Sequence, residues 1–182
     1  VAPEPFRVDS LLDKLMYDII ARRLADAEDC PDAVRRYFSA RADATNMLIA
    51  LRVGAMGQDA DFAQRLFVTG GTIAPDALGA VVAEPGKLLP LVRYQPFEAH
   101  VRRGLEFFEQ GEGLAPMEKQ LEDYGLSIFR AHRYDTDSIL PLVGYLLARE
   151  REASAVRLVV TAKAAKVSED ALSKRMRRLY MD

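Results

Sequence analysis

Few side chains in this sequence have the types and spacing that catalysis requires. Glu118 and Glu122 lie one helical turn apart, a spacing at which two carboxylates could act as general acid and general base. Exposed helices show the same spacing routinely, Lys119 lies beside the pair, and neither a nucleophile nor a set of pocket residues accompanies it. We therefore predict a solvated helix face at this pair and no catalytic residue in the chain.

Metal-ligating side chains are equally sparse. The two histidines, His100 and His132, lie on separate predicted helices, whereas a metal site needs closer spacing or several further Asp, Glu or Cys ligands. Asp135 and Asp137 follow His132, but they also precede a long apolar segment, so we interpret them as helix caps. The single cysteine, Cys30, precludes an intramolecular disulfide and fits a reducing compartment. The sequence predicts neither a metal ion nor a cofactor.

One glycine cluster, Thr69-Gly70-Gly71-Thr72, resembles a phosphate-binding loop. A P-loop needs a longer glycine-rich loop with Lys and Ser/Thr after a strand, and those features are missing here. Glycine pairs commonly end helices, because glycine adopts left-handed backbone angles without strain. We expect this pair to end the helix before it and not to bind a nucleotide.

Net charge and its distribution restrict the classes of partner. The 182 residues carry a formal net charge of −2, which gives no argument for binding nucleic acid or an anionic membrane surface. Residues 1–30 hold seven acidic and four basic side chains, whereas residues 161–182 hold six basic and three acidic ones. The basic side chains of this end include Lys174, Arg175, Arg177 and Arg178. We interpret them as a solvated or protein-contacting face, since no helix-turn-helix pattern accompanies them.

Membrane-spanning and targeting segments are not evident in the sequence. No apolar run approaches the roughly 18–20 residues that cross a bilayer, and the first residues lack the basic and apolar regions of a signal peptide. Because the chain also lacks an initiating Met, we expect a processed or truncated product.

The periodicity predicts an all-α protein built from antiparallel helical bundles, since no segment alternates with a two-residue period and most connections are short. Helices are predicted over residues 9–28, 31–53, 58–68, 75–82, 96–108, 116–132, 138–164 and 168–180, the first capped by Asp9 or Ser10. Four prolines or glycines interrupt residues 84–96, which we interpret as a linker or crossover. A boundary there divides the chain into two helical domains, residues 1–90 and 91–182.

Apolar lines along the helices predict which faces are buried. They comprise Leu12, Leu15, Met16, Ile19 and Leu24 in the first helix; Val34, Phe38, Thr45, Leu48 and Ile49 in the second; Phe97, Val101, Leu105 and Phe108; Leu121, Tyr124 and Ile128; and Leu142, Leu146, Ala153, Val156 and Val160 in the longest. Arg149 falls on the last line. We hypothesise that Arg149 is partly buried and fixes one helix against another, which requires an acidic partner.

Two parts of the chain are interpreted as copies of one helical unit. Asp43-Ala44-Thr45 begins an apolar run and Ile73–Leu78 follows it, while Glu152-Ala153-Ser154 begins a second run and Val167–Leu172 follows that. The copies are 109 positions apart at the acidic residue and 94 apart at the second motif, so the first holds 15 extra residues. We expect those residues to form an extra helix, 58–68. A duplicated helical unit without catalytic residues indicates a scaffold or coupling part rather than an enzyme.

The order and the residues of these helices resemble the C subunit of the V-type (A-type) ATP synthase, the prokaryotic relative of the eukaryotic d subunit. The resemblance covers nearly the whole chain and rests on Leu12-Asp13-Lys14-Leu15-Met16-Tyr17, on Asp43 to Leu48 with Leu51-Arg52 and Gly70-Gly71, on Leu146 to Glu152 with Val156 to Val159 and Lys163, on Val167 to Leu172, and on Arg175 to Tyr180. Ala155 departs from the pattern, since the family often has Asn where Asn46 stands in the first copy.

The resemblance implies a funnel of three similar helical domains, of which this chain corresponds to the C-terminal two-thirds. It also implies a non-catalytic part that couples the central stalk to the membrane ring of a rotary ATP synthase, serving proton or sodium transport. Its implied partners are the other ATPase subunits and not nucleic acid, and its implied location is peripheral, on the cytoplasmic side of the membrane.

The alternative is a free-standing helical adaptor or regulator, including a nucleic-acid-binding one. Copurification with rotary ATPase subunits, as against a soluble partner or salt-sensitive DNA binding, separates the two hypotheses.

Overall fold

The computed structural model of the chain describes residues 5–169, 172 and 176, and these form helices and loops without a strand among them. The helices are α1 (Pro5–Asp26), α2 (Asp32–Ala55), α3 (Ala60–Leu66), α4 (Pro75–Ala83), the 3-10 helix η1 (Pro85–Lys87), α5 (Leu88–Leu91), α6 (Glu98–Glu109), α7 (Ala115–Arg130) and α8 (Leu140–Ala164). The predicted all-α class is confirmed. The predicted last helix, residues 168–180, lies largely outside the described residues.

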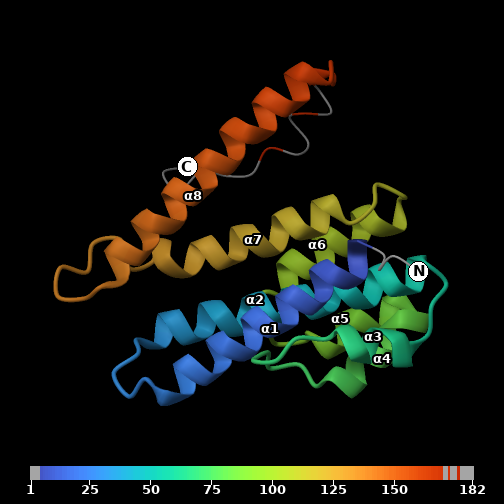
Figure 1. Cartoon of the computed structure of the whole chain (residues 1–182), viewed down its shortest axis with the longest axis horizontal. Helices are drawn as coiled ribbons and strands as arrows, with labels where there is room; N and C mark the ends of the chain where they lie inside the picture. Colours follow the sequence, from blue (N-terminus) through green and yellow to red (C-terminus); the bar gives the residue numbers. More distant parts are fainter. Residues whose placement is uncertain (1–4, 170–171, 173–175, 177–182) are drawn as a thin grey trace.

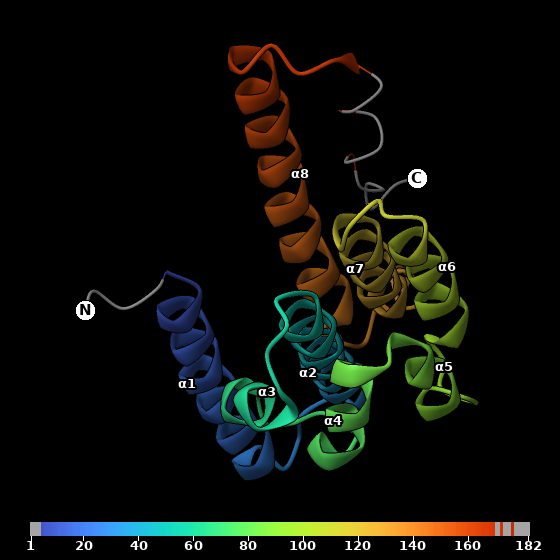
Figure 2. The same ribbon diagram turned by 90° about the vertical axis from the view of Figure 1, so that its right-hand side faces the viewer.

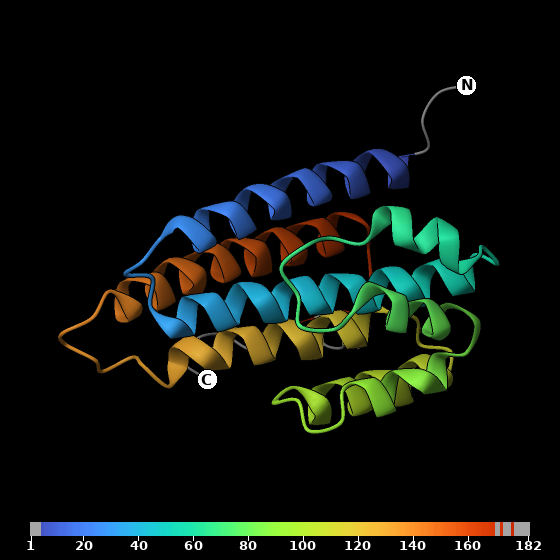
Figure 3. The same cartoon turned by 90° about the horizontal axis from the view of Figure 1, so that it is seen from below.

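Two long antiparallel hairpins form the frame of the molecule. The α1–α2 hairpin and the α7–α8 hairpin lie side by side, with α2 against α7 (Figures 1 and 3). The shorter helices α3 and α4 pack on α2, and α6 packs along α7. None of the described helices combines the length and apolarity of a membrane-spanning segment.

Local signals explain where several helices begin. Asp59 caps α3 by accepting a hydrogen bond from the backbone N–H of Phe62 at 2.8 Å, and Pro75 is the first residue of α4, where a missing N–H costs nothing. The hydroxyl of Ser138 accepts a hydrogen bond from the N–H of Leu140, the first residue of α8, at 3.2 Å. The prediction that Asp9 or Ser10 caps the first helix is wrong, because α1 already begins at Pro5.

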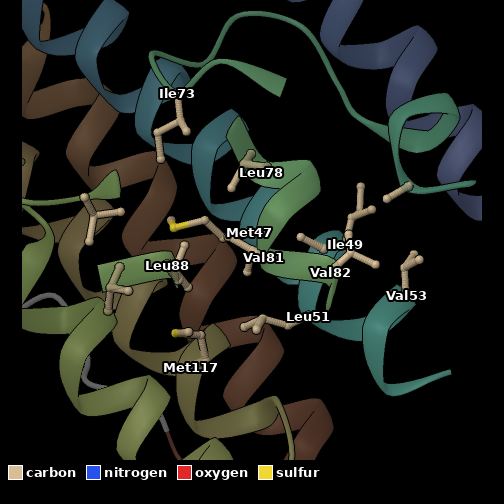
Figure 4. Close-up of a cluster of buried hydrophobic side chains, with 14 of the residues drawn as sticks. Met47, Ile49, Leu51, Val53, Ile73, Leu78, Val81, Val82, Leu88 and Met117 are labelled. Carbon is tan, nitrogen blue, oxygen red and sulfur yellow. The ribbon is translucent and has the colours of Figure 1, made fainter. Parts of the chain in front are cut away.

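The main core lies between α2, α4 and α7 (Figure 4). Its fully buried members include Met47, Leu51, Leu78, Val81, Leu88 and Met117. The interrupted stretch 84–96 is more than a linker, since it forms η1 and α5 and buries Leu88 and Val92 completely. The core therefore continues across residue 90. The division into residues 1–90 and 91–182 stays a prediction.

Two of the predicted apolar lines lie on the solvent side instead of the core side. In α1 the buried residues are Ser10 and Tyr17, whereas Leu12, Leu15 and Ile19 are exposed. In α8 the buried residues are Leu140, Gly144 and Ala148, together with Ala162 near the end, and the line from Leu142 to Val160 is exposed. Both helices carry apolar residues on opposite sides, so periodicity alone could not identify the side that packs. The lines predicted in α6 and α7 are confirmed, with Val101, Leu105, Leu121 and Ile128 buried.

Candidate functional site: a groove between two helical hairpins

The candidate functional site is a groove between the two hairpins. Figure 2 shows α2 between α1 and α7, with α8 rising above α2 beside α7. The groove has a cavity volume of about 490 Å³. Its lining comes from α1 (Asp13, Met16, Tyr17), α2 (Tyr37, Ala40, Arg41, Ala44, Thr45, Leu48), α7 (Glu118, Leu121, Glu122, Gly125, Leu126) and α8 (Leu147, Glu150, Arg151, Ser154). A groove bounded by four long helices is suited to an extended or helical polypeptide segment.

Tyr17 fixes the α1 wall to α2. Its hydroxyl donates to the carbonyl of Arg41 at 3.3 Å and shares a hydrogen bond of 3.0 Å with Thr45. The ring is buried in a small cluster with Ala42 and Val68. Burial raises the pKa of the Tyr17 phenol, while the hydrogen bond to Thr45 lowers it by a smaller amount. The phenol therefore stays protonated and keeps donating its hydrogen bond.

Beneath α1, the loop of residues 67–73 is held by two buried polar side chains of α2, Asp43 and Asn46. One carboxylate oxygen of Asp43 accepts hydrogen bonds from the backbone N–H groups of Thr72, at 2.8 Å, and Ile73, at 2.9 Å. The other carboxylate oxygen accepts a hydrogen bond from the Thr72 hydroxyl at 2.7 Å. The side-chain amide of Asn46 accepts a hydrogen bond from the backbone N–H of Val68 at 2.7 Å and donates one to the backbone carbonyl of Val68 at 3.0 Å. These bonds satisfy both side chains, which removes most of the cost of burying them.

The glycine pair in this loop does not end α3, contrary to the prediction. Helix α3 ends at Leu66, four residues before Gly70. Gly71 instead allows the backbone to approach Asp43, because a Cβ placed there would lie 2.3 Å from a carboxylate oxygen. Gly70 has a φ of +94° and accepts a hydrogen bond at its carbonyl from Ser39 at 2.7 Å. The pair is required for the loop to reach α2.

An ion pair with little solvent exposure fixes the α8 wall to α7. The Arg151 guanidinium lies 2.7 Å from the Asp123 carboxylate, and both side chains are only 11% exposed. A second guanidinium nitrogen donates to the backbone carbonyl of Glu122 at 3.0 Å. Because removal of either partner would leave a buried charge, the pair holds α8 in one position along α7.

The hypothesis that Arg149 is the buried arginine is wrong. Its side chain is 62% exposed and pairs with Glu152 on the same helix. Such an exposed pair contributes little to stability. Arg151, two residues further on, faces the opposite side of α8 and makes the inter-helix contact that was expected of Arg149.

Glu118 and Glu122 do more than form a solvated face. Glu118 pairs with Arg52 of α2 at 3.1 Å, and Glu122 lies 3.7 Å from Arg151 of α8. Together with Asp13 and Glu150 they place four carboxylates in the lining of the groove, against Arg41 and Arg151 of the lining and Arg52 beside Glu118. The lining therefore has a small excess of acidic over basic side chains beside its apolar residues, a combination that fits a partner helix with basic and apolar faces.

The remaining candidates lie apart from one another. His100 packs against Tyr124 with ring centroids 5.7 Å apart. His132 forms a hydrogen bond of 2.7 Å with Asp135. The prediction that Asp135 caps α8 is therefore wrong, because its carboxylate binds His132. Cys30 lies partly buried between α1 and α2. Among the described residues, no three His, Cys, Asp or Glu side chains are grouped as metal ligands. The basic terminal cluster from Lys174 lies outside the described residues.

The ion pair of Arg151 and Asp123 was not predicted from the sequence, although one signal could have found Arg151. Leu140, Gly144 and Ala148 recur every four residues and lead to Arg151 on the same helix face. Small residues at this spacing indicate a close helix contact, and the arginine at its end is placed to be buried. No comparable pattern identifies Asp123.

The contact that Asp43 makes is not repeated at Glu152, its counterpart in the second copy. About 12 helical residues follow each acid, which carries the chain roughly 18 Å away. In the first copy, α3 and its flanking loops bring the chain back to Asp43. In the second, Val167 lies only three positions after the end of α8 at Ala164, and three positions span no more than about 10 Å. The extra 15 residues, predicted to form a helix and seen as α3, therefore make the first contact possible.

Comparison with known proteins assigns the chain to a family. Residues 2–175 match the family described as ATP synthase (C/AC39) subunit. The chain belongs to this family. The C subunit of the A-type ATP synthase of Haloferax volcanii is 25% identical over 167 residues, and that of Halobacterium salinarum is 25% identical over 169 residues. The corresponding protein of Haloquadratum walsbyi is 22% identical over 167 residues.

These C/AC39 relatives are longer than the chain. The matches cover 90–91% of this chain and 47% of each relative, so the chain spans about half the length of the curated relatives it matches. No solved structure matches the chain at a significant level.

Proposed function

We propose that the chain is a non-catalytic coupling part of an A/V-type rotary ATP synthase, which links the central stalk to the membrane ring during ion transport. The observation that carries the proposal is the family match over residues 2–175, together with relatives named as the C subunit of A-type ATP synthases. In this proposal residues 1–90 and 91–182 form two similar wedges of the coupling part. The chain would lie peripherally on the cytoplasmic side of the membrane and would bind other ATPase subunits, not nucleic acid.

The groove supports this role because a part that transmits torque must resist deformation while holding a partner. Each wall is fixed to the core by polar contacts, the α1 wall by Tyr17 and the α8 wall by Arg151. The floor is formed by α2 and α7, which are packed into the main core. We infer that the groove receives an elongated segment of a neighbouring subunit, with the Asp13 and Glu150 carboxylates of its lining facing basic side chains.

A capture experiment tests the proposal. The affinity-tagged chain is incubated with detergent-solubilised membranes of the source organism, and the recovered proteins are identified by mass spectrometry. The proposal predicts recovery of stalk and ring subunits of the rotary ATPase. Recovery of a soluble partner alone, or salt-sensitive binding to DNA, would contradict it and favour a free-standing adaptor.

Two matched variants locate the contact. Ser154→Trp places a large ring in the groove, whereas Thr161→Trp places the same ring on the same helix outside the groove; both positions are exposed. We expect Ser154→Trp to reduce recovery of ATPase subunits several-fold and Thr161→Trp to leave it unchanged. Equal recovery with both variants would show that the groove is not the contact surface.

A further inference from the structure

Tyr94 has a backbone conformation that residues of its type rarely adopt. Its φ is +71°, in the left-handed region, where the Cβ of a residue other than glycine crowds the following carbonyl oxygen. Because glycine lacks a Cβ and asparagine tolerates these angles, those two residues usually fill such positions. A bulky residue at a positive φ is strained, and strained residues gather at binding and catalytic sites.

The fold requires this backbone conformation but not this side chain. Helix α5 ends at Leu91, and the chain turns before α6 begins at Glu98. The backbone N–H of Tyr94 donates a hydrogen bond to the Glu98 carboxylate at 3.0 Å, and the N–H of the next residue donates one to the carbonyl of Val92 at 2.9 Å. Both donors are main-chain groups, which any residue except proline supplies. The turn therefore explains φ at residue 94 without explaining the tyrosine.

The Tyr94 ring lies outside the packed interior. It is 85% exposed, and the Arg93 guanidinium lies 5.1 Å from its centroid. An exposed tyrosine is ordinary by itself, but here so little of the ring is buried that burial does not offset the strain of the backbone. Lys166, a second described residue with a positive φ, of 55°, differs because it follows α8, where a cation stabilises the helix end. An uncharged ring gives α5 no such benefit.

The turn that carries the ring is anchored on both sides. We define the Tyr94 corner as residues 92–98. Val92 is fully buried and Phe97 is 4% exposed, and both belong to the main core. Between them Arg93, Tyr94 and Pro96 are exposed. An aromatic side chain on an anchored turn is preorganised for binding, because little backbone entropy is lost when a partner covers it.

The Tyr94 corner lies away from the groove. The lining of the groove includes none of residues 92–98, all of which the structure describes, and Figure 2 shows α5 and α6 on the opposite side of α2 from α1. Tyrosine and arginine are enriched at protein–protein contacts, where such rings fill apolar pockets. A carboxylate at the edge of such a pocket would pair with the Arg93 cation. Glu98 within the corner and the net charge of −2 disfavour a nucleic acid in that place.

A further part of the same polypeptide is the other candidate for covering the ring, since the chain matches only 47% of the length of its relatives. Interfaces that are buried permanently are mainly apolar. The outer faces of α1 and α8 have that composition, with exposed leucines and valines. The Tyr94 corner instead surrounds one ring with Arg93, Glu98 and Arg102, of which the last two form an ion pair of 2.6 Å. Such polar surroundings are typical of contacts between separate proteins.

We propose that Tyr94 is an anchor by which the chain binds a separate protein, with the ring in an apolar pocket of that partner and Arg93 paired with a carboxylate at the edge of the pocket. The corner then gives the molecule a second contact surface, on the other side of α2 from the α1 wall of the groove. The inference rests on the conformation and exposure of Tyr94 and does not depend on the proposed ATP synthase role, although a part that links two others needs two such surfaces.

Nitration by tetranitromethane, followed at each tyrosine by mass spectrometry of peptides, tests the contact. Tyr134 is the matched control, because its ring is 80% exposed and the Arg133 guanidinium lies 4.8 Å from its centroid. We expect both tyrosines of the purified chain to react at similar rates. In gently lysed cells of the source organism, where complexes stay assembled, we expect the rate at Tyr94 relative to Tyr134 to fall several-fold.

Tyr94→Asn tests whether the ring serves the fold. Asparagine keeps the left-handed turn and removes the ring, so we expect the melting temperature to stay the same or to rise by roughly 2 °C. Tyr134→Asn, the control, should leave the melting temperature unchanged. A fall of several degrees in Tyr94→Asn alone would show that the ring stabilises the fold, which would remove the reason for the proposal.

Three results of the nitration experiment would also overturn the proposal. An equal ratio of the two rates in the purified chain and in lysed cells would show that nothing covers Tyr94. Slow nitration of Tyr94 in the polypeptide purified alone from the source organism would assign the cover to the same polypeptide. Protection that a nuclease removes would assign the cover to a nucleic acid.

Discussion

The carboxylate of Asp43 in α2 binds Thr72 through both the backbone N–H and the side-chain hydroxyl of that residue, at 2.8 and 2.7 Å. Asp43 is fully buried, and Thr72 lies 29 positions further along the chain. The contact fixes the loop between α3 and α4 against α2. Through Val68 and Thr69, which contact Tyr17 and Asp18, the same loop supports the α1 wall of the groove.

Replacing Asp43 by Ala leaves the buried backbone N–H of Ile73 and the partly buried N–H of Thr72 without an acceptor. We expect the free energy of unfolding to fall by about 3 kcal/mol, since each unsatisfied buried group costs roughly 1–3 kcal/mol. Chemical denaturation monitored by circular dichroism measures the loss. The matched control is Asp137→Ala in an exposed loop, which we expect to change stability by less than about 0.5 kcal/mol. Equal effects of the two substitutions would refute the importance of the contact.

Gly71→Ala tests the same contact from the loop side. The new Cβ would lie 2.3 Å from the Asp43 carboxylate, so the loop must move away from α2. We expect a loss of roughly 2 kcal/mol in thermal or chemical unfolding, in the range of overpacked sites. Gly86→Ala is the control, because nothing lies within 4 Å of a Cβ built there. A neutral Gly71→Ala variant would show that the close approach is not needed.

Arg151 and Arg149 make a matched pair for substitution by Leu. Arg151→Leu leaves Asp123 charged and poorly exposed, and we expect a loss of about 3 kcal/mol. Arg149→Leu removes an exposed pair on one helix, and we expect a change within about 0.5 kcal/mol. Denaturant titration of both variants measures the difference. The reverse order of effects would restore the hypothesis that Arg149 is the inter-helix contact.

Tyr17 gives the chain a pH dependence above neutrality. Its pKa is raised above the ordinary value of 10.0 because the phenol is buried, so the folded state holds the proton more tightly than the unfolded state. The stability contribution is complete below pH 10.0 and is lost as pH rises through the folded pKa. We expect unfolding free energy to fall less steeply above pH 10.0 in Tyr17→Phe than in the unchanged chain.

The control for that titration is Tyr134→Phe, whose ring is 80% exposed. It should follow the unchanged chain at every pH. Identical alkaline profiles for Tyr17→Phe and the unchanged chain would show that Tyr17 does not titrate differently on folding.

The sequence predicts where the helices lie along the chain better than it predicts which face of each helix is buried. Pro75, Ser138 and the breaks near Gly111 mark helix ends by local backbone chemistry, which a single sequence displays directly. The packing side of α1 and α8 depends on which neighbour each helix meets, and both helices are apolar on two sides. Asp43 and Asn46 are buried only because a loop more than twenty residues away supplies their partners, and no local pattern encodes that distance.

The residues that line the groove were also not predictable from local sequence patterns. Glu118 and Glu122 were recognised as a one-turn pair, but their partners Arg52 and Arg151 come from two other helices. The sequence therefore predicts no catalytic residue, and it does not locate the groove. The family resemblance was confirmed because it rests on the order of many helix positions rather than on one site.

Coupling of ATP turnover to ion movement is the proposed role of the chain, and the ratio of the two rates tests it most directly. ATP hydrolysis and ATP-driven ion uptake are measured together in membrane vesicles from cells of the source organism with the gene intact or deleted. The proposed role predicts that deletion abolishes uptake while a substantial part of the hydrolysis remains, and that the restored gene returns the ratio to its original value. An unchanged ratio of uptake to hydrolysis after deletion would contradict it.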